Sequence, residues 1–535
     1  MGGHMDSSNR EVLGQSGRAD GQNHRQIWLA LVLVVIAVTL VGRVWNDWHS
    51  ANKAKQSAAD YVAFMAVVSQ ADSIADPSQR CLRYPNLPGS HWDDGTTSAY
   101  CQLRNRHYLQ LSEIDILLQQ GKADEVDRTF KGYLDAQLHD PKQPGLLDAA
   151  FYSAGFDEAD TNTRKIIDLW KQQAPNSAYA LAASGMQYVD AAHKARGRGW
   201  ARDLSDDQVD GMRQQLALAR QDLDRAVLLL PAITPAFTSM VYLGALEGDE
   251  DYMNQAARGG LAVDPANFAL RVQMMNFSQP KWGSAFGGEG EQMRETEALV
   301  AHNSLLRMVA QDPVVYRATC DCGDAAGEQI RQLMLAADKN VSYGNLKGLA
   351  NEAYDQAPLL AVELYSESLR FNPADADALQ WRAQLMVKLG DGDGAIKSIA
   401  QTAQRFPDDN AIGTKLGHIY AYTGHVKEAE NTFLAVLKRD PDNQQAMAEA
   451  GDLYNHAAHQ PEKAEALADI LISRHPENPA GYIVRVCNQM DHNLPGRYDT
   501  IHYFIDHFGD QPEFKSQVAE MRTYLANHPE KTGTG

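Results

Sequence analysis

Basic residues are scarce in this sequence relative to acidic ones. Lysine and arginine together number 49, against 69 aspartates and glutamates, and the formal net charge is −20 at pH 7. Because a nucleic-acid backbone is bound by clustered lysine and arginine, this balance argues against a nucleic-acid-binding protein. An acidic surface chiefly favours solubility, so the charge alone identifies no partner.

Sequence signatures of catalysis and metal binding are also missing. The chain has no Gly-x-Ser-x-Gly elbow, His-Glu-x-x-His pair, phosphate-binding loop or dinucleotide fingerprint. Its 5 cysteines include Cys320 and Cys322, but no further thiols or histidines lie nearby at the spacing of a metal site. We therefore expect a protein that is not an enzyme and binds no cofactor and no metal. A catalytic group assembled from distant positions stays an alternative.

Long hydrophobic runs are limited to one. Residues 27–42 are all apolar or small apart from Thr39, with Trp28 near the start and Trp45 just beyond the end. Tryptophans at both ends are typical of membrane interfaces. A cleaved signal peptide would have a shorter apolar region and a small-x-small cleavage site, which this run lacks. The pattern predicts one uncleaved transmembrane helix, with a buried core helix as the alternative.

The few cysteines are informative because of where they lie. Cys81 and Cys101 fall in a stretch whose Pro, Gly and Trp content predicts a loop with little support from helix packing. A disulfide between them would close a loop of about 20 residues and add about 3 kcal/mol in an oxidising compartment. Two free thiols are the alternative, and the pairing of Cys320, Cys322 and Cys487 stays open.

The location of the protein follows from these two features taken together. The numbers of basic residues before and after the hydrophobic run are nearly equal, so they do not determine the orientation of the predicted helix in the membrane. The predicted disulfide favours an oxidising compartment for the part that follows the run. We expect a single-pass protein of the bacterial inner membrane with the bulk of the chain in the periplasm.

The most regular part of the sequence is 342–478. One proline and one alanine recur there at steps of 34, 34 and 35 residues, at Pro373, Pro407, Pro441 and Pro476 and at Ala361, Ala395, Ala429 and Ala464. Since proline cannot continue a helix, each repeat is expected to end at its proline. A repeat of about 34 residues with this ending indicates helical hairpins that stack on their neighbours.

The clearest repeat, 410–443, shows how such a hairpin is built. Gly417 and Ala429 fall where its two helices would cross, because small side chains let helix axes approach closely. Gly424 would end the first helix, since glycine adopts the left-handed conformation at little cost. The repeat resembles the tetratricopeptide repeat (TPR). That resemblance implies a solenoid of hairpins whose open inner surface binds protein.

Residues 101–302 show helical periodicity with a less regular spacing, which predicts degenerate hairpins of the same kind. Two segments, 196–200 and 280–288, interrupt this regularity. The region 101–302 resembles an uncharacterised bacterial helical domain family of envelope proteins, and the resemblance rests on the Ala-x-x-Ala-Arg-Gly stretch at 192–197 and on the Pro-Lys-Trp-Gly segment that begins at Pro280. That family has no established chemistry to transfer. Trp282 in the second segment is expected to pack as a wedge beneath a loop, with an exposed recognition loop as the alternative.

The expected fold is all-α, an α-solenoid of TPR and TPR-like helical hairpins preceded by one transmembrane helix. Its expected segments are a disordered cytoplasmic tail at 1–26, the transmembrane helix at 27–45, a linker with the Cys81/Cys101 loop at 46–100, a degenerate TPR-like helical domain of unknown function at 101–302, an irregular connector at 303–341, the TPR repeats at 342–478 and C-terminal capping helices at 479–535.

The candidate protein-binding residues come from the first helix of each repeat. Some positions of that helix pack on the hairpin partner, which leaves the others as a stripe facing the groove of the solenoid. We name these residues the binding stripe; they are Trp381, Gln384, Lys388, Lys415, His418, Tyr422, Glu449, Asp452 and His456. The alternatives are that they are merely solvated, or that the chain's own N-terminal domain fills the groove. His456 and His459 together are expected to be solvated.

The binding stripe differs from that of TPR domains that clamp a terminal carboxylate. Gln380 and Gln384 stand where Lys and Asn would be needed, and Glu449 stands where Arg would be. An internal segment or a folded surface is therefore the expected ligand. The expected function is a membrane-tethered scaffold for envelope proteins. The alternatives are an immunity-type protein that neutralises a secreted toxin and, with the least support, an envelope hydrolase.

Overall fold

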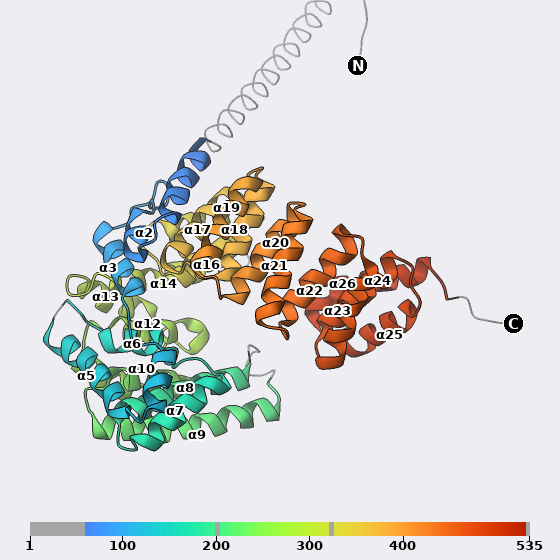
Figure 1. Ribbon diagram of the computed structural model, residues 1–535. Coiled ribbons are helices and arrows are strands. Elements are labelled where there is room, and N and C mark those ends of the chain that lie inside the picture. Colours follow the sequence, from blue (N-terminus) through green and yellow to red (C-terminus); the bar gives the residue numbers. More distant parts are fainter. Residues whose placement is uncertain (1–58, 141, 198–203, 320–325, 531–535) are drawn as a thin grey trace, which may run out of the picture. The chain divides into compact units, whose positions relative to one another are not determined.

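The computed structural model describes residues 59–140, 142–197, 204–319 and 326–530, and all regular elements within these ranges are helical (Figure 1). The chain divides into two compact units, Met1–Ala66 and Val67–Gly535. Of the first unit, residues 59–66 are described, and they are helical.

Several expected features lie outside the described residues. These are the tail at 1–26, the transmembrane helix at 27–45, and Cys320 with Cys322. Within the described ranges, none of the helices combines the length and the apolar character needed to cross a membrane.

The predicted repeats form helical hairpins in the second unit. Their first helices are α16 (Tyr343–Ala353), α18 (Ala376–Lys388), α20 (Asn410–Tyr422) and α22 (Gln444–Asp452). Their second helices are α17 (Pro358–Phe371), α19 (Gly392–Arg405), α21 (Val426–Arg439) and α23 (Pro461–Arg474). Each first helix packs on the second helix that follows it, and each hairpin stacks on the next. This part of the chain is thus an all-α, TPR-like arrangement, as predicted.

Small residues hold the hairpin α20–α21 together in the predicted way. Gly424 follows α20 with φ of +81°, the left-handed conformation that favours glycine. A Cβ atom added at Gly417 would lie 2.5 Å from a ring carbon of Phe433, so the two helices meet with no room for a side chain there. Ala429 is fully buried. The close crossing inferred from sequence is confirmed.

After the repeats, the described residues form three more α-helices: α24 (Pro479–Asp491), α25 (Arg497–Phe508) and α26 (Lys515–Asn527). They share a small core that contains Ile501, Phe504 and Met521. Helices are thus present where the sequence predicted them, and their role as a cap stays a prediction.

The expectation of a loop around Cys81 and Cys101 is wrong. The two cysteines lie on helices, α2 (Pro77–Arg83) and α3 (Asp94–Asn105), and both are buried. Each helix begins at an aspartate whose side chain accepts a hydrogen bond from the backbone, Asp76 from Gln79 and Asp93 from Thr96. Such caps stabilise even short helices, so the proline and glycine content was misleading.

These two helices dock on the first repeat. At the end of α17, the carbonyl groups of Leu369, Arg370 and Phe371 have no partner in their own helix. The guanidinium of Arg80 donates to the first two at 3.1 and 3.2 Å, and that of Arg104 donates to the third at 3.2 Å. The positive charges also complement the negative end of the helix dipole. The side chains of Arg80 and Arg104 therefore cap the C-terminal end of α17 by binding its backbone carbonyl groups.

The disulfide between Cys81 and Cys101 joins α2 to α3, with Cα atoms 5.7 Å apart, and confirms the predicted pair. Replacing both cysteines by alanine is expected to lower the free energy of unfolding by about 3 kcal/mol, because the bond closes a loop of 20 residues. Denaturant unfolding measures this change, with Cys487→Ala as a control that removes a thiol outside any disulfide.

The same disulfide bears on the compartment. Both sulfur atoms are buried, so mass spectrometry of unreduced peptides from freshly purified protein should show Cys81 and Cys101 linked. Finding both alkylated would contradict the disulfide and the oxidising compartment together.

The described residues of the region 101–302 form packed helices. They are α4 (Leu111–Gln119), α5 (Ala123–His139), α6 (Leu146–Ser153), α7 (Thr161–Gln173), α8 (Ala178–Arg196), α9 (Asp206–Leu229), α10 (Thr234–Glu247), α11 (Glu250–Val263), α12 (Phe268–Phe277) and α13 (Glu289–Ala298). The pairs α4–α5 and α10–α11 are hairpins that turn at glycines with positive φ, Gly121 and Gly248. Trp282 is half-buried and packs edge-on against Phe277, which supports the wedge interpretation.

The expected irregular connector at 303–341 is wrong for the part that the structure describes. It contains α14 (Leu306–Thr319) and α15 (Ala326–Ala337). Pro313, which suggested an irregular segment, lies inside α14. Contacts of α14 with α12, α13, α15 and α16 compensate for the hydrogen bond that the proline removes.

Candidate protein-binding surface

The structure links three residues of the binding stripe across successive repeats. The Gln384 amide on α18 lies 2.7 Å from Nε2 of His418 on α20, and Nδ1 of His418 lies 2.9 Å from the Glu449 carboxylate on α22. A carboxylate only accepts, so Nδ1 of His418 carries the proton that is donated to Glu449. Nε2 is then free to accept from the Gln384 amide. This chain fixes the three first helices in register.

Aromatic rings flank this chain of hydrogen bonds. Trp381 keeps 39% of its surface exposed and packs edge-on against Tyr354, over whose ring the Lys388 ammonium lies at 4.4 Å. Tyr422 keeps 49% exposed and stacks on His418. Large aromatic side chains that stay this exposed are typical of protein-binding surfaces.

Tyr354 was missed by the sequence analysis. It follows α16 and occupies the same repeat position as Lys388, Tyr422 and His456 in the later repeats. Applying the repeat positions to the first repeat would have found it.

Lys415 differs from the prediction of an open side chain. It is only 9% exposed, and its ammonium lies 3.3 Å from Asp377. The ion pair therefore joins α20 to α18, and the lysine presents little free charge to a ligand.

The last residues of the binding stripe, Asp452 and His456, lie in acidic surroundings. His456 is exposed, as predicted, but its ring nitrogens lie 2.9 Å from Asp452 and 3.2 Å from Asp491. His459 is also exposed, with φ of +50°. Within the described ranges, no group of three or more His, Cys, Asp and Glu side chains is placed to hold a metal ion.

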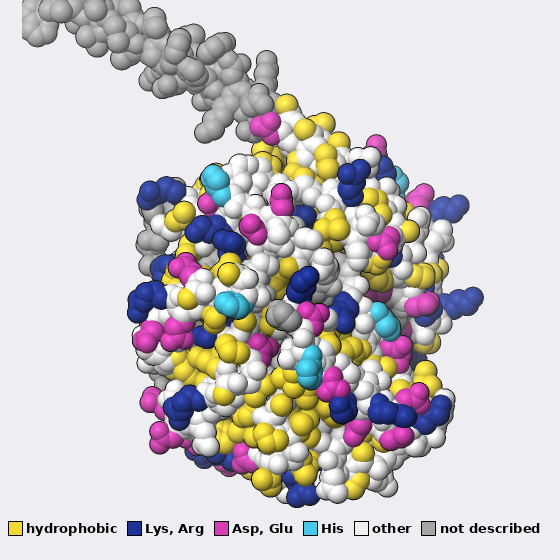
Figure 2. Space-filling view, turned by 90° about the vertical axis from the view of Figure 1, so that its left-hand side faces the viewer, with side chains coloured by type: hydrophobic (Ala, Val, Ile, Leu, Met, Phe, Trp, Pro, Cys, Tyr) yellow, Lys and Arg dark blue, Asp and Glu magenta, His cyan; other side chains and the backbone are white. Residues whose placement is uncertain are grey.

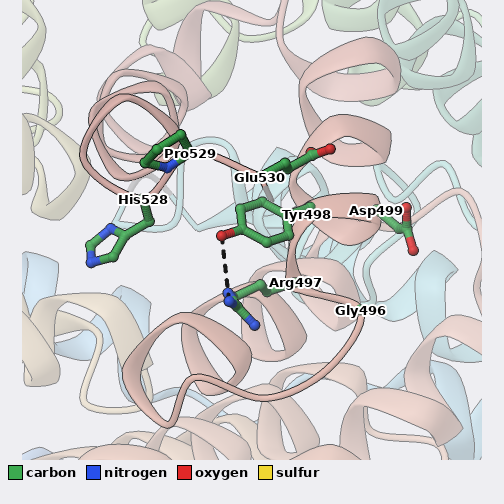
Figure 3. A pocket seen from close by; sticks show the side chains of 7 residues that line it. All are labelled: Gly496, Arg497, Tyr498, Asp499, His528, Pro529 and Glu530. Carbon is green, nitrogen blue, oxygen red and sulfur yellow. Dashed lines mark hydrogen bonds between the residues drawn. The ribbon is translucent and has the colours of Figure 1, made fainter. Parts of the chain in front are cut away.

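A separate hollow lies near the C-terminus, between the start of α25 and the residues that follow α26 (Figure 3). Arg497 donates to the hydroxyl of Tyr498 at 3.4 Å across it, and its guanidinium also covers that ring. None of the binding stripe lines this hollow, so it adds nothing to the candidate site.

Charged side chains of both signs are mixed on the molecular face in Figure 2, around groups of hydrophobic side chains.

No family model matches this sequence, and no curated protein is similar to it. The resemblance of 101–302 to an envelope domain family therefore stays a prediction. Among solved structures, a TPR protein from Thermus thermophilus is 17% identical, with 34% of this chain and 100% of that chain covered and a TM-score of 0.29. A TPR protein from Parabacteroides merdae is 13% identical, with 54% and 98% covered and a TM-score of 0.33.

Yeast Tom70 is 10% identical, with 78% of this chain and 95% of that chain covered and a TM-score of 0.33. At these scores the likenesses assign no function to this chain.

Proposed function

We propose that the chain is a TPR-like scaffold of the bacterial envelope, tethered by 27–45 with its bulk in the periplasm, which binds a segment of a partner protein along the binding stripe. The observation that carries the binding role is the Gln384–His418–Glu449 chain beside exposed Trp381 and Tyr422. Polar groups held in place by one another and flanked by exposed rings lose little freedom when a ligand binds.

An internal segment is the expected ligand. The side chains along the stripe offer amide, imidazole and carboxylate groups, and its lysines are already engaged, Lys415 with Asp377 and Lys388 with Tyr354. A terminal carboxylate would find few free donors there.

The test is capture of the partner by a variant that lacks the two exposed rings. Trp381→Ala with Tyr422→Ala is expected to weaken partner binding by at least about 2 kcal/mol, or roughly 30-fold, because aromatic anchors dominate binding energy at such surfaces. The partner is first identified by pull-down with the parent chain, and its dissociation constant is then measured with purified components.

Trp282→Ala serves as the control, since Trp282 lies in the N-terminal helical region and far from the repeats in sequence. Unchanged binding by the double variant, with loss of binding by Trp282→Ala, would place the site in the region 101–302 instead. The identity of the captured partner separates an envelope scaffold from a toxin-neutralising protein.

A further inference from the structure

A cavity of about 290 Å³ lies beside the acidic end of the binding stripe, between α22 with its π-helical extension and α24. Ile483 and Val484 on α24 form part of an apolar side, and Glu449 and Asp452 on α22 form part of a polar side. Sites for drug-sized ligands begin at roughly 300 Å³. The cavity is thus at the lower end of that range, and one long side chain has room in it.

The shape of α22 at this cavity has a cause in the sequence. The repeat step is 35 residues here where the preceding steps are 34. The helix accommodates the longer step as a π-helix at Leu453–Ala457, in which the Ala458 amide donates to the Leu453 carbonyl five residues back. Such π-turns inside helices are frequently found at functional sites.

Asn455 lies in this π-turn and lines the cavity. It is only 2% exposed, and its amide nitrogen donates to Asp491 at 2.9 Å. Because a carboxylate only accepts, the nitrogen must face Asp491, which fixes the orientation of the amide. The Asn455 carbonyl oxygen is buried and has no hydrogen-bond partner among the described residues. A buried acceptor without a partner calls for a donor from water or from a ligand group.

The charge of the cavity indicates which kind of donor group it would bind. All lining residues lie within the described part of the chain, and none of them is a lysine or an arginine. The pKa of the Cys487 thiol is raised to about 11, chiefly by burial and then by the nearby carboxylates of Asp491, Asp452 and Glu520. The potential in the cavity is thus negative, and a cation is favoured there.

We propose that this cavity binds the guanidinium group of an arginine carried by the partner segment, an inference that rests on the proposed function. Asn455, Glu449 and Asp452 all line the cavity, and each side chain carries an acceptor oxygen. A planar group with five N–H donors can serve several of them at once, and it is more weakly hydrated than an ammonium. The methylene stem would lie along Ile483 and Val484.

Cys487 reports occupancy of the cavity because it lies in the wall and is outside any disulfide. The full chain is treated with N-ethylmaleimide in the presence of N-acetyl-arginine amide, N-acetyl-lysine amide or the neutral isostere N-acetyl-citrulline amide. Peptide mass spectrometry follows the modification of Cys487 alone. The arginine probe should slow it in a saturable way, and the citrulline probe should not.

A charge-removing variant tests the acceptors. Glu449→Gln with Asp452→Asn should raise the half-saturating concentration of the arginine probe roughly tenfold or more, because charge-assisted hydrogen bonds are lost. Half-saturation is unaffected by any change in the intrinsic reactivity of the thiol. Asp355→Asn is the matched control, since Asp355 is exposed and lies near Lys388, at the opposite end of the stripe. It should leave the half-saturating concentration unchanged.

Equal protection by citrulline or lysine, or no protection by arginine, would overturn the proposal. These outcomes are distinct from failure of the proposed function. If arginine gives no protection while Trp381→Ala with Tyr422→Ala still loses the partner, the stripe binds protein and the arginine cavity is wrong. If arginine protects but the double variant keeps its partner, the cavity stands and the aromatic anchors are wrong.

Discussion

Asp72→Asn is expected to lower the free energy of unfolding by about 3 to 5 kcal/mol, the usual effect of removing one partner from a buried ion pair. The Asp72 side chain is 4% exposed and lies 2.6 Å from Arg80 and 3.4 Å from Arg382, which are themselves nearly inaccessible. It also accepts a hydrogen bond from Tyr84. Asparagine would leave both guanidinium groups buried without a counter-charge.

The position of Asp72 explains why the effect reaches the repeats. Arg80 also holds the carbonyl groups at the end of α17, and Arg382 lies on α18. Arg405 on α19 donates to the backbone carbonyls of Asp72 and Ile74. Loss of the carboxylate therefore loosens the contact between the N-terminal segment and the first repeats. Urea unfolding measures the size of the loss, and hydrogen exchange of α17 amides locates it.

The same carboxylate gives the effect a defined pH dependence. Burial would raise the pKa of Asp72, but Arg382 and Arg80 with the bond from Tyr84 outweigh burial and hold that pKa below its ordinary value of 3.8. The stabilisation is then complete above 3.8 and is lost as the pH falls toward the folded-state pKa. The difference between parent and Asp72→Asn should be constant from neutral pH downward and should shrink only in acid.

Asp124→Asn is the matched control for this variant. Asp124 pairs with Arg128 on the surface, where the two side chains are 78% and 70% exposed. An exposed pair of this kind contributes about 0.5 kcal/mol or less. An effect of Asp72→Asn as small as that of Asp124→Asn would show that the buried network does not hold the segment in place.

Phe433→Ala is expected to cost roughly 3 to 5 kcal/mol, because Phe433 is 1% exposed and its removal leaves a cavity inside the hairpin α20–α21. Gly417→Ala in the parent should cost about 1 to 3 kcal/mol by overpacking, since the added methyl group would lie 2.5 Å from the Phe433 ring. In the Phe433→Ala background the same methyl group enters the void. Gly417→Ala should there be neutral or stabilising.

Denaturant unfolding of the parent, the two single variants and the double variant measures this coupling as a double-mutant cycle. Gly132→Ala is the control, since Gly132 is an exposed residue of α5 where an added Cβ meets nothing within 4 Å. It should stabilise by about 0.5 to 1 kcal/mol through helix propensity alone. Additive effects at Gly417 and Phe433 would contradict the close helix crossing.

Much of the fold was predictable because helical hairpins are encoded locally. The recurring prolines, Gly417, Gly424 and Ala429 act within one repeat, so their spacing alone predicts where helices end and cross. The binding stripe was predictable in part for the same reason. His418 does meet residues of both neighbouring repeats, but Lys415 is buried by Asp377 from the preceding repeat.

What the sequence alone determined is therefore the repeat period, the helix ends and most of the residues that line the proposed binding surface. The tertiary structure decided the features that depend on partners far apart in the chain. The helices that carry Cys81 and Cys101 form where Arg80 and Arg104 reach the end of α17, more than 250 residues away. The cavity beside Asn455 exists only because α24 packs against α22 and its π-turn. No local pattern reports such pairings, since their energy comes from burial and hydrogen bonds between segments that the sequence keeps apart.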